Sequence, residues 1–199
     1  MSPANSLRIT QTTTNAKPYH RRSGGVSLLE LLLVLAVIAF LSAVIVGDDN
    51  APSSEQQRSN TANAVMAALI HARQTASYQG QSMGIWCDTA NQQLKVFRLD
   101  HSSNPPNPVY DVRHPLSQQI YTLSFETSAL PARLEQCQFN YQGYGSDNQR
   151  LDFQRGSAAP VLYLGGGPYL LTSGSIELSL DQQSSVITIY PQNGSVVLQ

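Results

Sequence analysis

The feature that constrains this chain most is an unbroken apolar run over residues 26–46, VSLLELLLVLAVIAFLSAVIV. Only Ser27, Glu30 and Ser42 are polar in this run, and it contains neither Gly nor Pro. As an α-helix rising about 1.5 Å per residue, the run is roughly 31 Å long, which matches the hydrocarbon thickness of a bilayer. We therefore expect residues 26–46 to form one membrane-spanning helix that the protein retains.

The charges on either side of the run predict its orientation. The first 25 residues carry four basic side chains and no acidic one, whereas Asp48 and Asp49 follow the run almost directly. Positively charged flanks stay on the cytoplasmic side of a membrane. The N-terminus is therefore expected in the cytoplasm, and everything after Gly47 is expected on the other side.

The remainder of the chain, residues 26–199, is acidic. It holds eight Lys and Arg against thirteen Asp and Glu, a net charge of −5. Nucleic-acid binding relies on clustered positive charge that neutralises phosphates, and no basic tract lies outside the first 25 residues. Nucleic acid is therefore not expected as a main partner.

Glu30 needs an explanation, because an ionised carboxylate near the edge of hydrocarbon costs roughly 1–3 kcal/mol. One interpretation is that its side chain, about one turn into the helix, reaches back to the lipid headgroups. The other is that the carboxylate meets a cation when the helix packs against a neighbouring subunit. A free α-amino group on Val26 of that neighbour would suit, and it would require cleavage between Gly25 and Val26.

The stretch GVSLLELLLVLAVIAFLSAVIV resembles the class III signal of type IV pilins and type II secretion pseudopilins. In that family a prepilin peptidase cuts after the glycine and methylates the new N-terminus. The resemblance implies cleavage between Gly25 and Val26 and N-methylation of Val26. It also implies that Glu30, the fifth residue of the mature chain, pairs with the N-terminus of an adjacent subunit. The chain departs from the usual pattern in having Val26 instead of Phe and a 25-residue leader.

The resemblance also implies partners and a location. The partners would be prepilin peptidase, other pilins or pseudopilins in a filament, and inner-membrane lipid. The protein would cross the bacterial inner membrane once, with a cytoplasmic N-terminus and a periplasmic head built into a filament. Further along, ALIHARQTASYQGQSMGIWC, LDFQRGSAA and SVITIYPQNGSV are similar to segments of the pseudopilin H and FimT-type minor pilins.

Four segments are predicted: a cleaved cytoplasmic leader (1–25), a transmembrane helix (26–46), a periplasmic stem helix (47–80) and a β-rich periplasmic head (81–199). In the stem, Pro52 and a cap at Ser53 or Ser54 precede a helical stripe that ends before Gly80. The stripe consists of Ala62, Val65, Met66, Leu69, Ala72, Arg73 and Ala76. The expected fold class is α+β, a long N-terminal helix packed on a mostly antiparallel sheet.

The head shows alternating strand patterns. SMGIWCDT and QLKVFRLD are predicted to form a hairpin that turns at residues 90–92, and the later strands are QIYTLSFET, RLEQCQFNYQ, RLDFQR and PVLYLGG. The chain closes with further strands in GSIELSLDQQSSVITIYPQNGSVVLQ. Turns are predicted at residues 181–184 and at Asn193-Gly194, the second of type I′. Gly165, Gly166 and Gly167 are predicted to form a mobile loop.

The chain has two cysteines, Cys87 and Cys137, both in segments predicted as strands on the oxidising side of the membrane. A disulfide between them would close a loop of about 50 residues, worth about 2–4 kcal/mol. The alternative is two buried thiols that act as small apolar groups. The disulfide is the favoured alternative, although the sequence leaves both open.

Catalysis is not expected. Residues 80–84, GQSMG, match G-x-S-x-G around Ser82, but that motif needs a strand before the serine and a helix after it, the reverse of the order here. The four histidines, His20, His71, His101 and His114, form no metalloprotease or triad spacing. Neither cysteine has a CxxC partner, so no metal and no cofactor are expected.

Three functional classes follow from these observations. The leading one is a structural subunit, a minor pseudopilin of a type II secretion filament for protein export. The second is a binding module, a minor type IV pilin involved in pilus assembly, adhesion or DNA uptake, for which Tyr141, Tyr144 and Tyr169 near Gly are a hint. The third is a single-pass membrane protein without a filament role, which cleavage after Gly25 would exclude.

Overall fold

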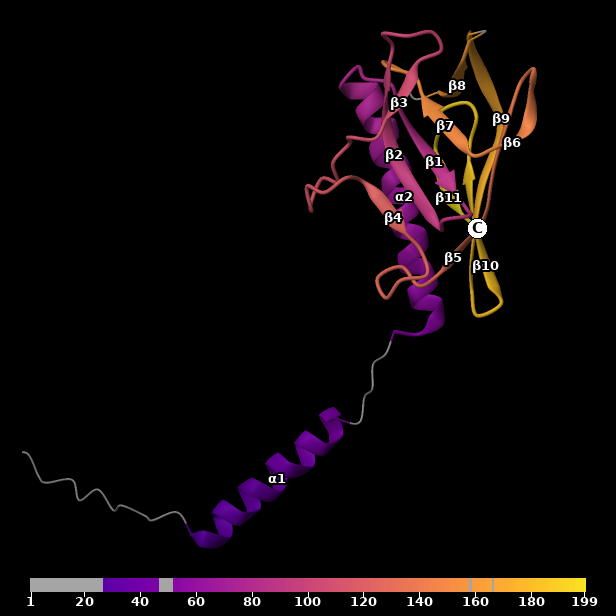
Figure 1. Cartoon of the computed structure of the whole chain (residues 1–199). Helices are drawn as coiled ribbons and strands as arrows, with labels where there is room; N and C mark the ends of the chain where they lie inside the picture. Colours follow the sequence, from indigo (N-terminus) through magenta and orange to yellow (C-terminus); the bar gives the residue numbers. More distant parts are fainter. Residues whose placement is uncertain (1–26, 47–51, 158, 166) are drawn as a thin grey trace, which may run out of the picture. The chain divides into compact units, whose positions relative to one another are not determined.

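The computed structural model describes residues 27–46, 52–157, 159–165 and 167–199, without the side chains of 40–46 and 145–148. The chain divides into two compact units, residues 1–50 and residues 51–199 (Figure 1). Each unit is described by itself below.

The first unit contains helix α1, Leu28–Val46. Its sequence is rich in Leu and Val, and the absence of Gly and Pro leaves its backbone hydrogen bonds unbroken. Residues 26–46 are predicted above to span a membrane. Among the described residues, no helix has the length and hydropathy needed to cross one.

The second unit begins with helix α2, Ser54–Tyr78. The hydroxyl of Ser53 accepts a hydrogen bond from the backbone N–H of Gln56, which satisfies one of the free donors at the helix start. The helix ends at Tyr78, and Gly80 just beyond it has a φ of 63°, which suits a residue without a Cβ. The cap at Ser53 and the end before Gly80 are as predicted.

One face of α2 is buried against the strands. Its buried residues recur every three or four positions: Thr61, Ala62, Val65, Ala68, Leu69, Ala72, Thr75 and Ala76. Four alanines let the sheet approach the helix closely, and α2 packs against strands of the sheet described below. In the predicted stripe, Met66 and Arg73 are only half-buried.

The first two strands form the predicted hairpin. Strand β1 (Met83–Asp88) pairs antiparallel with β2 (Gln93–Asp100), and Asp88 lies opposite Gln93. The carboxylate of Asp88 accepts the backbone N–H of Asn91 inside the turn, which is a common way for Asp to stabilise a turn.

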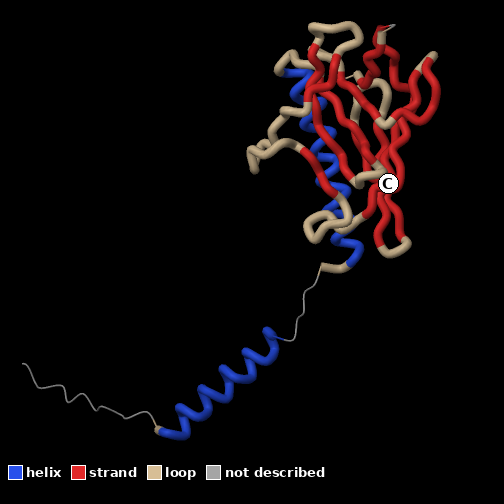
Figure 2. The backbone as a smooth tube through the Cα atoms, in the orientation of Figure 1, coloured by secondary structure: helices blue, strands red, loops and turns tan. Residues whose placement is uncertain are grey.

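The other described strands complete an antiparallel sheet, as Figure 2 shows in red. They are β3 (Asn107–Val109), β4 (Thr122–Ser124), β5 (Arg133–Tyr141), β6 (Tyr144–Asn148), β7 (Arg150–Phe153), β8 (Pro160–Leu164), β9 (Gly167–Leu180), β10 (Gln183–Ile189) and β11 (Val196–Leu198). The main path runs β11-β10-β9-β8-β7-β1-β2-β3, and β4, β5 and β6 pair beside it. The predicted α+β class with a mostly antiparallel sheet is confirmed.

Strand β9 pairs with different strands along its length. Its first residues, 167–170, pair with β8, whereas residues 171–179 pair with β5 and residues 174–180 pair with β10. The predicted strand GSIELSL is therefore only the second half of a 14-residue strand. Gly167, predicted in a mobile loop, is instead the first residue of β9.

The turn predicted within residues 181–184 is confirmed, whereas the connection at Asn193-Gly194 is not of the predicted type. Between β9 and β10, Asp181 and Gln182 both have positive φ, 52° and 65°, which defines the two-residue turn of type I′. The predicted type I′ turn at Asn193-Gly194 is wrong, because only Gly194 of that pair has positive φ. Its N–H donates to the carbonyl of Tyr190, so the connection is a longer loop.

Two short strands were not predicted, β3 and β6. Strand β3 contains Pro108, which removes a backbone donor, and it lies at the end of the main path of the sheet, where proline is tolerated. Of the predicted strand QIYTLSFET, only residues 122–124 pair in the sheet as β4.

Candidate functional site

The candidate assembly site is the start of α1. The carbonyl oxygen of Ser27 accepts the backbone N–H groups of Glu30 and Leu31, at 2.9 and 3.1 Å, so Glu30 lies in the first helical turn. A carboxylate there is stabilised by the positive end of the helix dipole. Its side chain is exposed and makes no hydrogen bond or ion pair with any residue that the structure describes.

Gly25 and Val26, the predicted cleavage site, lie outside the described residues. Cleavage between them and N-methylation of Val26 therefore stay predictions. So does the pairing of Glu30 with a neighbouring N-terminus.

Cys87 on β1 and Cys137 on β5 form a disulfide. Both residues are buried, their Cα atoms are 6.2 Å apart, and they are separated by 50 positions in the chain. The bond links strands that do not pair with each other. A disulfide of this kind is typical of oxidising compartments.

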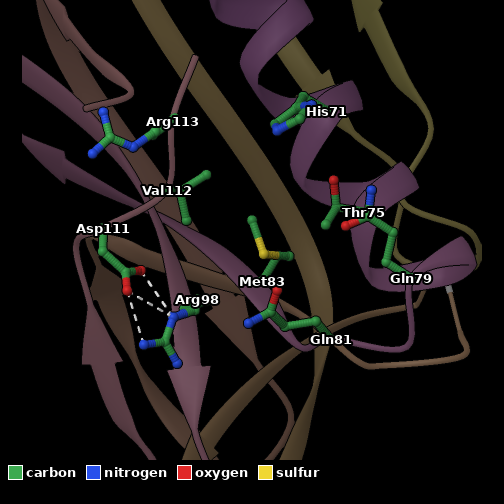
Figure 3. A pocket seen from close by; sticks show the side chains of 9 residues that line it. All are labelled: His71, Thr75, Gln79, Gln81, Met83, Arg98, Asp111, Val112 and Arg113. Atoms are coloured by element: carbon green, nitrogen blue, oxygen red, sulfur yellow. Dashed lines mark hydrogen bonds and ion pairs between the residues drawn. The ribbon is translucent and has the colours of Figure 1, made fainter. Parts of the chain in front are cut away.

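A pocket of about 400 Å³ lies between α2, the start of β1 and the segment after β3. Figure 3 shows Arg98 and Asp111 on one side of it and the helix residues on the other, with Met83 and Gln81 between them. The residues that line it are His71, Thr75, Gln79, Gln81, Met83, Arg98, Asp111, Val112 and Arg113.

An ion pair forms one wall of this pocket. The Nε atom of Arg98 donates to Oδ1 of Asp111 at 2.8 Å, and its NH2 group donates to Oδ2 at 2.8 Å. This bidentate hydrogen bonding lowers the pKa of Asp111 and raises the pKa of Arg98. Both side chains are partly exposed, so solvent screens the pair.

On the helix side, His71 is the titratable residue. Burial lowers the pKa of its imidazole, and His114 across the pocket edge lowers it further. The ordinary pKa of a histidine is about 6.5, so a lowered pKa favours the neutral imidazole near pH 7. The pocket thus combines the Arg98–Asp111 ion pair and a second cation, Arg113, with uncharged polar groups.

A buried ion pair lies elsewhere on the sheet, between Arg150 and Asp152 on β7. Arg150 donates to both carboxylate oxygens, at 2.8 and 2.9 Å, and the backbone N–H of Tyr163 donates to Oδ2 at 3.0 Å. Asp152 is fully buried, and burial raises its pKa while Arg150 and the Tyr163 amide oppose that rise. The guanidinium also lies 5.3 Å from the ring centre of Phe97.

The serine in the G-x-S-x-G match has a structural partner set. Ser82 is 1% exposed, its Oγ lies 3.0 Å from Nε2 of His101, and it accepts the backbone N–H of Arg155 at 3.3 Å. The ring of His101 packs edge-on against Tyr163. Ser82 follows a helix and precedes a strand, so it joins three segments and offers no exposed nucleophile.

The three tyrosines mentioned above separate in the structure. Tyr141 is buried, and its hydroxyl donates to the carbonyl of Arg150 at 2.8 Å, so it belongs to the core. Tyr144 and Tyr169 are brought together, with ring centres 5.4 Å apart, and Tyr144 is 43% exposed. Of these three tyrosines, Tyr144 is the exposed one, because Tyr169 is half-buried against the core.

Within the described ranges, no three or more His, Cys, Asp or Glu side chains are grouped so that they could hold a metal ion. The expectation of no metal and no cofactor stays a prediction.

Three side-chain contacts of the head were not predicted from the sequence. Arg150 and Asp152 are two positions apart in a strand, which places them on one face, so their pairing could have been found from the sequence. Arg98 and Asp111 are joined across a loop, and His71 and His114 lie on different elements, so no spacing rule connects either pair.

No protein-family model matches the chain, and no curated protein sequence matches it. Among solved structures, it is similar to the minor pseudopilin EpsH from the type 2 secretion system of Vibrio cholerae. One EpsH structure has a TM-score of 0.43 and 14% identity, over 71% of this chain and 94% of EpsH. A second has a TM-score of 0.44 and 16% identity, over 73% and 95%.

The chain is also similar to the type IV minor pilin FimU of Pseudomonas aeruginosa strain PAO1. The TM-score is 0.41 and the identity 16%, over 73% of this chain and 90% of FimU. Similarities at this level assign no function to the chain.

Proposed function

We propose that this chain is a pilin-like structural subunit of a filament and, more narrowly, a minor pseudopilin of a type II secretion system. The observation that carries the proposal is Glu30. It is an exposed carboxylate in the first turn of an apolar helix, five positions after Gly25 and without a partner among the described residues.

In this proposal, prepilin peptidase cuts between Gly25 and Val26 and methylates the new N-terminus. The ammonium group on Val26 of one subunit then pairs with Glu30 of the next. In a lipid environment two opposite charges attract strongly, which offsets much of the cost of removing each from water. An unpaired Glu30 would oppose packing, so the pair sets the axial position of each subunit.

The remaining parts of the chain have matching roles. The large apolar side chains of α1 between Leu28 and Ile38 are 49–77% exposed, a surface that lipid or neighbouring helices would cover. Residues 26–46 would anchor the protein in the bacterial inner membrane, with the N-terminus cytoplasmic and the head periplasmic. The disulfide suits that oxidising compartment. The protein would act by assembly and partner choice, without catalysis.

The alternative is a minor type IV pilin involved in pilus assembly, adhesion or DNA uptake. The exposed ring of Tyr144, which packs against half-buried Tyr169, favours it, since an aromatic ring at the surface can stack on a ligand. The acidic charge of residues 26–199 speaks against nucleic acid as that ligand.

The first test is the intact mass of the protein isolated from membranes of cells with and without prepilin peptidase. We expect a mature chain that begins at N-methylated Val26 only in cells with the peptidase. A Gly25→Leu variant is the matched control and should keep residues 1–25. A wild-type chain that retains its leader in the presence of the peptidase would exclude the filament role.

A deletion strain separates the two filament types. Loss of protein secretion with normal pili supports the pseudopilin, whereas loss of pili with normal secretion supports the minor pilin. The deletion should be complemented with the wild-type chain in both cases.

A further inference from the structure

The segment that joins β3 to β4, residues 110–121, forms a small hairpin that we call the strap (Figure 2). The backbone N–H of Tyr121 donates to the carbonyl of Val112 at 2.8 Å, and that of His114 donates to the carbonyl of Gln119 at 2.8 Å. The carbonyl of Tyr121 accepts the N–H of Val96 on β2. The strap is thus attached to the sheet at its base and closed by its own hydrogen bonds.

The tip of the strap is organised around the imidazole of His114. Its Nδ1 atom accepts the backbone N–H groups of Leu116 and Ser117, at 3.2 and 3.3 Å. A ring nitrogen that accepts a hydrogen bond carries no proton, so these two bonds require the neutral form. An imidazolium would present an N–H to both donors instead.

The tip also holds a residue in a conformation that it would not adopt alone. Gln118 has a φ of 58°, a left-handed conformation that side chains with a Cβ disfavour. Its carbonyl accepts NH1 of Arg113 at 2.7 Å, and its side chain donates to the carbonyl of Pro115 at 3.0 Å. The closed tip therefore depends on its hydrogen bonds, including the two to His114.

At the base of the strap, Tyr121 packs between the imidazoles of His114 and His71. The ring of Tyr121 is 3% exposed and lies between two imidazoles, with centres 4.6 Å from His114 and 5.5 Å from His71 on α2. The charged groups around His71 are Arg98 from β2 and Asp111 and Arg113 from the strap. Asp111 is the carboxylate among the residues that line this pocket, and it is engaged by Arg98, so within that lining it is not free to pair with two protonated histidines.

We propose that the strap is an acid-sensitive latch, in which neutral His114 holds residues 110–121 closed against α2 and protonation of His114 opens them. Acid removes both acceptor bonds at the tip and places like charges beside Tyr121. Opening would uncover Tyr121 and remove the wall that Asp111, Val112 and Arg113 give the pocket of Figure 3. The head would thus present a different surface in acid.

The test is amide hydrogen exchange of the full chain in detergent micelles, at about pH 8 and about pH 5, the range over which histidine titrates. The protection of peptides covering residues 110–121 is expressed relative to β5 of the same chain, which also verifies that the head stays folded. We expect the relative protection of the wild-type strap to fall about tenfold in acid, as two hydrogen bonds are lost.

His114→Asn is the decisive variant, since its side-chain oxygen can accept the same N–H groups but does not titrate. Its strap should stay protected within about twofold at both pH values. His114→Ala should be poorly protected at both. His101→Asn, which removes a histidine elsewhere on the head, should behave as wild type. Unchanged protection of the wild type in acid, or an equal acid response in His114→Asn, would overturn the proposal.

Discussion

Gly84 on β1 shows how one residue without a side chain permits a charged pair to be buried. A Cβ placed there would clash with Cζ of Phe97 and would lie 2.8 Å from Oδ1 of Asp152. Both neighbours are fully buried and cannot move aside easily. The space above Gly84 is therefore occupied by the Phe97 ring and the Asp152 carboxylate.

We predict that Gly84→Ala lowers the free energy of unfolding by at least about 1–3 kcal/mol, the usual cost of overpacking a core. The measurement is urea unfolding of the full chain in detergent, followed by Trp86 fluorescence. Gly165→Ala is the matched control, since its nearest neighbour, Cδ of Pro105, is 3.9 Å from the added Cβ. Equal stability of the two variants would contradict the clash.

Arg150→Ala should cost more, about 3–5 kcal/mol near pH 7, because it leaves the buried carboxylate of Asp152 without its charge partner. The pKa of Asp152, already raised by burial, should then rise further above its unfolded value of about 3.9. When the pKa of a group is higher in the folded than in the unfolded protein, the folded protein loses stability as pH rises and the group gives up its proton. The defect should therefore be smaller at about pH 4 than at about pH 7.

Chemical unfolding at both pH values checks this prediction. Arg98→Ala is the control, because it breaks an ion pair that solvent already screens and should have a much smaller effect. A defect of Arg150→Ala that grows toward acid would show that Asp152 is not the group responsible.

At the scale of elements, the disulfide connects β1 with β5, and its removal is the direct test of its contribution. A Cys87→Ala/Cys137→Ala double variant should lose about 2–4 kcal/mol, since the bond restricts the unfolded chain over 50 positions. Unfolding with and without a reductant measures the effect. Reductant should lower the stability of the wild type and leave the variant unchanged. A double variant as stable as the oxidised wild type would be the contrary result.

The elements that could be predicted are those with local signals. Helix α2 has an N-cap serine, a 3.6-residue apolar period and a terminal glycine, and the β1–β2 hairpin has strict alternation around a polar turn. These signals need no knowledge of the rest of the chain. The α+β class follows from them.

The elements that could not be predicted depend on distant partners. Strand β9 begins seven residues early because β8 and β5 supply hydrogen bonds to GPYLLTS, a stretch in which Gly and Pro disguise the strand. The type I′ turn falls on Asp181-Gln182 because the β9–β10 register demands it, although Asn-Gly is the commoner pair.

The candidate site also contains residues that could be predicted from the sequence and residues that could not. Glu30 stands out in the sequence because a charge in an apolar run is conspicuous. The His114 tip, the pocket and the Arg98–Asp111 pair rest on loop geometry that the sequence does not reveal.

At the scale of the whole molecule, the proposed assembly requires Glu30 for incorporation into the filament but not for retention in the membrane. Glu30→Ala should remain in the membrane fraction, since it makes the helix more apolar. It should be recovered with its filament much less than the wild type, because the neighbouring N-terminus loses its counter-ion. Membrane fractionation and co-isolation of filaments measure the two effects. Normal co-isolation of the variant would contradict the role of Glu30.

A matched variant tests whether charge or size matters. Glu30→Gln keeps the shape of the side chain but cannot pair with an ammonium group, and it should behave like Glu30→Ala. Glu30→Asp keeps the charge and should recover part of the incorporation.

The disulfide also gives the head a covalent topology. Cys87 and Cys137 close a ring of backbone that contains β2, β3, the strap and β4, including Leu116, which is 88% exposed at the tip. After a single proteolytic cut in this ring, the strands before the cut would stay joined to α2 by backbone, and the strands after it would stay joined through the disulfide. The nicked chain would run as one band on a gel until it was reduced. The head can therefore lose backbone continuity at the exposed tip around Leu116 and still transmit a pulling force between the segments before and after the cut.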